Sequence, residues 1–171
     1  MRSAQPLRLH LTSRSRRTAT PPLNSSVRHM ESHHYLAESE LPAGFTYPAS
    51  YRHFADACSP NVAAIPGLPP WIFAGTLAWA VKESSSVFGQ WLVPFAQAVQ
   101  RDLLCYFATA STGSNKVIVT NPWEPDAQFR YYEELPSFEA WLDFARAYSA
   151  TFLSENPEYS SRPAWFPGSL A

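Results

Sequence analysis

The residues that could do acid–base or metal chemistry are few and scattered. Of the five histidines, four lie in or near the first 34 residues, namely His10, His29, His33 and His34. Only His53 falls well inside the expected globular part, and its spacing from Tyr51 and Phe54 predicts a solvent-facing helix position rather than a catalytic one. Adjacent histidines point in different directions on any regular element. We therefore expect no metal site and no cofactor.

Nucleophilic chemistry finds no recognisable motif either. The two cysteines, Cys58 and Cys105, stand in no C-x-x-C pair and beside no histidine, so zinc-type spacing is absent. Cys105 lies in an apolar run and is expected to be a buried, reduced thiol. The sequence has no G-x-S-x-G elbow, and its six glycines are scattered rather than gathered in a phosphate-binding loop. These patterns predict a protein that is not an enzyme.

Acidic residues gather in the second half of the chain, at Asp102, Glu124, Asp126, Glu133, Glu134, Glu139 and Asp143. They are compatible with solvated positions, with an acidic surface for a partner, or with a catalytic acid pair. Trp123 stands among acids in a loop stiffened by two prolines, where it either anchors an interface or folds back onto the sheet edge. From their residue types and positions, we predict that a partner binds at Trp123, Glu124, Asp126, Glu133 and Glu134.

Charge is distributed unevenly, although the formal net charge of the chain is only −1. Residues 1–29 carry six arginines and no acid, which leaves the rest of the chain at −7. Such a globular part repels phosphate backbones, so we expect no nucleic-acid binding by it. The charge either attracts a basic protein partner or simply keeps the domain in solution, and charge alone does not separate these interpretations.

Composition also sets the expected domain limits. We predict a disordered Arg- and Ser-rich tail at 1–32, one domain at 33–156, and a Pro-rich tail at 157–171. The first segment could be a transit-like peptide, a basic arm, or a stretch upstream of a start at Met30. A dispensable or untranslated tail is the favoured interpretation. No apolar run approaches the roughly 20 residues that cross a bilayer, so a cytoplasmic protein without membrane contact is expected.

Apolar periodicity predicts the secondary structure. Helices are expected at 48–57 and 76–87, the first with Pro48 at its first position and Tyr51, Phe54 and Ala55 on one face. Strands are expected at 91–96, 103–109 and 116–120, more weakly at 128–132, with 71–73 as a further candidate. Pro94 places its strand at an edge or an irregularity. The short turn before residue 116 favours antiparallel neighbours.

The clearest element is a helix over 137–153. Ser137 is a suitable N-cap, and an apolar stripe follows at helical spacing: Phe138, Trp141, Leu142, Ala145, Tyr148 and Phe152. Such a stripe must lie on an apolar surface, and the sheet is the candidate. The predicted fold class is therefore α+β, with a small antiparallel sheet of about four strands packed against an N-terminal helix and a long C-terminal helix.

The order of these pieces resembles a known family. A Pro-x-x-Tyr-x-x-Phe helix (Pro48, Tyr51, Phe54) is followed by L-V-P-F-A at 92–96, by D-L-L-C-Y-F at 102–107, by V-I-V at 117–119 and by S-F-E-A-W-L at 137–142. This set is similar to the SUKH superfamily of cell-wall assembly regulators and bacterial immunity proteins. The chain departs from the family pattern at Arg101, where glycine is usual, and at 59–61, where Asn-Gly is missing.

The resemblance implies an α+β fold and a binding role without catalysis. It also adds Asp102, which matches the recurrent aspartate of the family, to the predicted partner-binding residues. The first hypothesis is a cytoplasmic immunity protein that neutralises a cognate toxin, expected to be a basic nuclease. The second is a regulatory interaction module with the Arg-rich tail as a functional arm. The third is an enzyme that uses an acid pair around Asp102.

Overall fold

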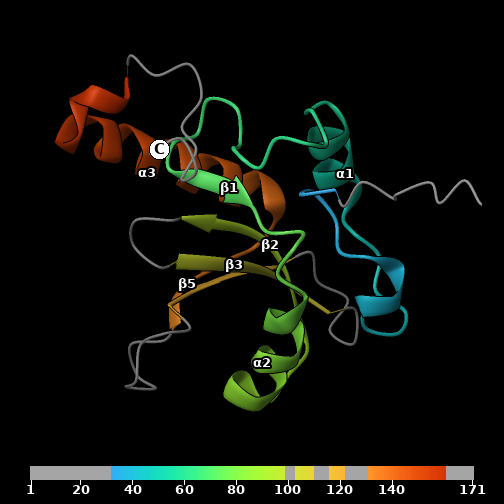
Figure 1. Cartoon of the computed structure of the whole chain (residues 1–171). Helices are drawn as coiled ribbons and strands as arrows, with labels where there is room; N and C mark the ends of the chain where they lie inside the picture. The colour runs from blue at the N-terminus through green and yellow to red at the C-terminus, as the bar shows by residue number, and fades with distance from the viewer. Residues whose placement is uncertain (1–31, 99–102, 110–115, 122–130, 161–171) are drawn as a thin grey trace, which may run out of the picture.

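The computed structural model describes residues 32–98, 103–109, 116–121 and 131–160. Five strands form one sheet, and helices cover both of its faces (Figure 1). The elements in chain order are η1 (Glu38–Glu40), α1 (Ala49–Asp56), β1 (Trp71–Phe73), α2 (Ala78–Phe88), β2 (Leu92–Ala98), β3 (Leu103–Ala108), β4 (Val117–Thr120), β5 (Tyr131–Leu135), α3 (Phe138–Glu155) and η3 (Pro157–Tyr159). The α+β class predicted from the sequence is confirmed.

The sheet is antiparallel, and its strands are neighbours in chain order from β1 to β5. It has five strands where about four were expected, because Trp71–Phe73 pairs with β2 through Ile72 opposite Gln97. The weak strand expected at 128–132 lies later, at Tyr131–Leu135; residues 128–130 fall outside the described part. The open edge of β1 is covered by the residues before it, since Phe73 N–H donates to Ala63 O at 2.7 Å.

Pro94 lies at an irregularity of the sheet, not at an edge, because β2 runs between β1 and β3. The pairing with β3 shifts between Pro94 and Ala96, so that Phe95 is the extra residue of a β-bulge. Proline has no N–H to donate, which suits a position where the ladder is interrupted. The bulge changes the alternation along β2: Val93 and Phe95 face the same core as Ala96 and Ala98.

Helix α3 lies on one face of this sheet (Figure 1). Its stripe is confirmed, since Phe138, Trp141, Ala145 and Phe152 are buried and Tyr148 is half-buried. Ser137 caps the helix as expected, because its Oγ accepts a hydrogen bond from Ala140 N–H at 3.3 Å. The Trp141 ring meets Phe95 edge-on with centroids 4.9 Å apart, and its Nε1–H donates to Cys105 Sγ at 3.2 Å.

Helix α1 packs beside α3 on the same face, where Tyr51 meets Phe138 edge-on at 5.3 Å. Pro48 is the N-cap and not the first helical residue, because its carbonyl accepts the hydrogen bond of Arg52 N–H at 3.0 Å. The prediction for His53 is confirmed, since the side chain is exposed. Both cysteines are free and Cys105 is fully buried, as expected from its apolar run.

The sequence placed only His53 well inside the globular part, but His34, near the start of the predicted domain, is part of the core as well. Its side chain is 2% exposed and lies on Phe73, with ring centroids 4.0 Å apart. His33 contacts the segment that joins β1 to α2, where Gly75 N–H donates to His33 O at 2.7 Å. A side chain at Gly75 would not fit, because its Cβ would stand 2.5 Å from His33 O. The contact of the two backbones buries the histidine despite its polar neighbours in sequence.

Helix α2 covers the opposite face of the sheet (Figure 1). A separate core lies beneath it, built from Ala74, Ala80, Leu92, Leu104, Tyr106, Ala108 and Ile118. Gly89 ends the helix in the left-handed conformation at φ 68°, which glycine adopts without the usual strain. In the part of the chain that is described, no helix combines the length and the apolar character that a bilayer crossing requires.

Candidate functional site

The residues predicted to bind a partner fall into two groups. Asp102, Trp123, Glu124 and Asp126 lie outside the described residues. Glu133 and Glu134 lie in β5 at the end of the sheet, and both are exposed. Successive strand residues point to opposite faces, so these two carboxylates do not converge on one ligand. Glu134 accepts a hydrogen bond from Lys116 Nζ, which partly offsets its charge.

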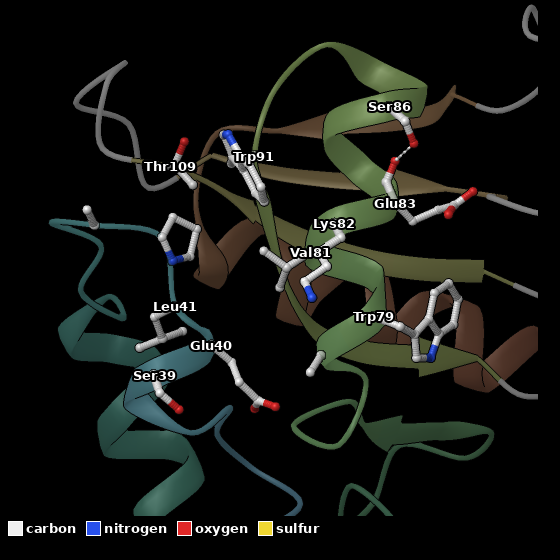
Figure 2. A pocket seen from close by; sticks show the side chains of 13 residues that line it. Ser39, Glu40, Leu41, Trp79, Val81, Lys82, Glu83, Ser86, Trp91 and Thr109 are labelled. Atoms are coloured by element: carbon white, nitrogen blue, oxygen red, sulfur yellow. Dashed lines mark hydrogen bonds between the residues drawn. The ribbon is translucent and has the colours of Figure 1, made fainter.

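A hollow of a different kind lies beside α2. It is an open groove of about 1140 Å³ between the segment at 39–43 and helix α2 (Figure 2). Its lining comprises Ser39, Glu40, Leu41, Pro42, Ala43, Ala78, Trp79, Val81, Lys82, Glu83, Ser86, Trp91 and Thr109. The groove thus combines two parts of the chain that are some forty residues apart, and it borders the larger core through the buried Val81.

The first wall is set by a short turn. Glu40 N–H donates to Ala37 O at 2.9 Å, and the Glu40 carboxylate in return accepts from Ala37 N–H at 3.2 Å. This reciprocal pair closes the single turn of η1 and satisfies backbone groups that the turn would leave free. Leu41 and Pro42 follow directly and are only half-buried. The wall therefore offers apolar side chains next to a carboxylate.

The second wall is α2, which Ser84 fastens to the sheet. Leu92 N–H donates to Ser84 Oγ at 2.9 Å, and the hydroxyl donates to Val81 O at 2.7 Å. With Ser84 facing inward, Val81 and Lys82 project toward the first wall, whereas Trp79 and Glu83 project from the other side of the helix (Figure 2). Gly89 then turns the chain, and Trp91 stands at the rim near Thr109 (Figure 2).

Two tryptophans at this groove are unusually open to solvent. Trp79 is 46% exposed and Trp91 is 50% exposed, the two highest values among the large apolar side chains described. Leaving this much aromatic surface in water forgoes part of the roughly 25 cal/mol per Å² that its burial contributes. Exposed aromatic area that borders a groove, instead of being scattered singly, is typical of binding sites.

The polar groups of the groove suit binding better than catalysis. Its described lining contains carboxylates, one ammonium group and three hydroxyls, but no imidazole and no thiol. The hydroxyl of Ser86 donates to Glu83 O at 2.9 Å within its own helix, so it is not aligned with a base.

Three residues with shifted pKa values, Cys105, Tyr47 and His34, are buried in the fold and do not line this groove. Burial raises the pKa of the Cys105 thiol well above its usual range, and it raises the pKa of Tyr47 to about 12. Burial likewise lowers the pKa of His34, although nearby backbone carbonyl groups oppose the shift. These shifts stabilise uncharged forms inside the fold. They do not place an acid or a base at the groove.

Among the described residues, no group of three His, Cys, Asp or Glu side chains could hold a metal ion.

The sequence analysis did not identify the groove. The local signal for the groove is a pair of tryptophans, Trp79 in the first turn of α2 and Trp91 shortly after its end. Glu40 and Leu41 are brought to the groove only by the fold. Comparisons of the chain with models of protein families, with curated proteins and with solved structures gave no match.

Proposed function

We propose that this chain is a protein-binding domain without catalytic activity, and that the groove beside α2 is its contact face. One observation carries the proposal: an open groove of about 1140 Å³ has the half-exposed Trp91 at its rim. Tryptophan is enriched among the residues that dominate binding energy at protein interfaces. Its large apolar area becomes favourable only when a partner covers it.

The shape and chemistry of the groove favour a polypeptide as the partner. Leu41, Pro42 and Val81 give it an apolar floor, and Glu40 and Lys82 stand across from one another at its margins (Figure 2). An apolar centre with charged residues around it is the usual composition of a protein interface. A small-molecule site would enclose its ligand more completely than this open groove does.

The partner we propose is a basic toxin domain, of the nuclease kind, which the chain neutralises in the cytoplasm as an immunity protein. This finer assignment is supported by the resemblance to the SUKH superfamily and by charge. The described residues contain ten acids and four bases, a net charge of −6. Such a surface speeds the encounter with a basic protein, and the exposed Glu133 and Glu134 contribute to that field.

The proposal is tested with the toxin domain encoded beside the gene for this chain. The dissociation constant is measured by isothermal titration calorimetry with the full chain and with Trp91→Ala. We expect Trp91→Ala to weaken binding at least about 30-fold, as loss of an interface hot spot of 2 kcal/mol or more does. Cells that express the toxin should then lose protection when the variant replaces the original chain.

Val62→Ala is the matched control, because Val62 is exposed at 42% and, unlike the two exposed tryptophans, does not line the groove. This variant should bind as the original chain does. Unchanged affinity in Trp91→Ala would show that the groove is not the contact face. Turnover of a substrate by the purified chain would reject the non-catalytic role altogether.

A further inference from the structure

The N-terminal segment enters the fold next to the groove. His33 is held between two loops, since its N–H donates to Pro60 O at 3.2 Å and its carbonyl accepts from Gly75 N–H at 2.7 Å. From there the chain runs directly into η1 and the groove wall that begins at Ser39. Whatever precedes residue 32 is therefore tethered a few residues from one wall of the groove.

The segment before residue 32 and the described part have opposite charges. Residues 1–30 hold six arginines and no acid, whereas the described residues have a net charge of −6. The described lining of the groove has the same sign, because it contains Glu40 and Glu83 but one cation, Lys82, and Glu38 lies next to it in η1. Opposite charges attract over roughly 10 Å at moderate salt, so this tether favours an encounter within one molecule.

The N-terminal segment also has apolar residues that suit the groove floor. Leu7, Leu9 and Leu11 alternate with Arg8 and His10, so in an extended backbone the three leucines share one side. Three arginines follow, at positions 14, 16 and 17. The pattern offers leucines to the apolar floor of the groove and guanidinium groups to the carboxylates beside it.

We propose that the groove binds residues 7–17 of the chain's own N-terminal segment, so that a protein partner must displace this segment to dock. The tether is long enough: the 20 residues between Leu11 and Ser32 can span up to about 70 Å. Tethering makes the contact intramolecular, with an effective concentration that reaches the millimolar range for suitable linkers. The contact gives the segment a role that a dispensable tail lacks.

Photo-crosslinking in the full chain tests this contact without any partner. Benzoylphenylalanine replaces Trp91 in one sample and Val62 in the other, two exposed positions of which only the first lines the groove. After irradiation, Glu-C digestion releases residues 1–31 intact, because Glu31 is the first glutamate of the chain. We expect cross-links from position 91 to this peptide, at monomer mass, and few or none from position 62.

Charge and leucine variants then examine the proposed chemistry. Replacing Leu7, Leu9 and Leu11 by serine should abolish the cross-link. Glu40→Lys should reduce it and Lys82→Glu should increase it, each by about two-fold or more, as expected for charges at a rim. Raising the salt concentration to about 1 M should weaken it further.

Equal cross-linking from positions 91 and 62, or yields that do not change in the leucine variant, would overturn the proposal. Products of dimer mass would also overturn it, because a second copy would then occupy the groove. Since the experiment involves no toxin, its failure leaves the proposed partner binding untouched, and failure of the toxin assay leaves this contact untouched.

Discussion

The two faces of the sheet are built from different residues and serve different ends. On the α3 face, large aromatic rings fill the space: Phe95 stacks on Phe107 at 4.1 Å and meets Trp141 at 4.9 Å. On the α2 face the core is smaller and consists mainly of alanine, leucine and one tyrosine. Both strongly exposed tryptophans border α2 rather than α3. The α3 face therefore buries most of its aromatic surface, while the α2 face leaves two tryptophans exposed to solvent, which is the surface we propose for binding.

Replacing a tryptophan by alanine on each face of the sheet tests this comparison most directly, and the larger effect is expected on the α3 face. Trp141 is fully buried between Phe95, Phe138 and Trp71, with ring centroids 4.9–5.5 Å away. Trp141→Ala would leave a cavity and also remove the donor to Cys105, so we expect it to cost about 3–5 kcal/mol of unfolding free energy. Urea denaturation followed by far-UV circular dichroism measures this. A loss below about 1 kcal/mol would show that the aromatic core is not the stabilising layer.

A smaller effect on the unfolding free energy is expected from the protonation of His34. Burial lowers the pKa of His34 in the folded chain, while the unfolded chain keeps a value near 6.5. The unfolded state therefore takes up the proton first as the pH falls. The neutral His34 therefore contributes fully to the free energy of unfolding above about pH 6.5. This contribution is lost as the pH falls below that value, with a slope of at most about 1.4 kcal/mol per pH unit.

Unfolding free energies measured between pH 8 and pH 5 should therefore show this loss, and His34→Gln should flatten the profile. His53→Gln is the matched control, because His53 is exposed on α1. It should leave the profile unchanged. If His34→Gln retains the original slope, His34 is not the group that links protonation to stability.

The contrast between the two faces also explains what the sequence could predict. Helix α3 and strands β3 and β4 were found because their signals are local: a capping serine, a helical stripe and short apolar runs. Pro94 correctly indicated an irregularity, since a missing N–H has the same consequence in any sheet. Strand β5 continues to Leu135, three residues beyond the predicted end, because two glutamates at 133 and 134 obscure its alternation.

The groove and the burial of His34 could not be read in the same way. Each depends on segments that are distant in sequence: residues 39–43 against α2 for the groove, and residue 33 against Gly75 for the histidine. Nothing in the neighbourhood of His34 distinguishes it from the histidines of the tail, because the close approach of the two backbones buries it. Sequence patterns predicted the elements well, but not which polar segment would close over them.

The smallest effect on the unfolding free energy is expected from Trp91→Ala, the counterpart of Trp141→Ala on the α2 side. Trp91 is half-exposed and stands at the rim of the groove, so Trp91→Ala should change the unfolding free energy by no more than about 0.5 kcal/mol. The same variant is expected to lose partner binding, which separates an anchor from a structural residue. Urea denaturation beside Trp141→Ala gives the contrast under identical conditions. A cost of more than about 2 kcal/mol for Trp91→Ala would mean that this side chain supports the fold, and the weakened binding could then no longer be attributed to a lost contact.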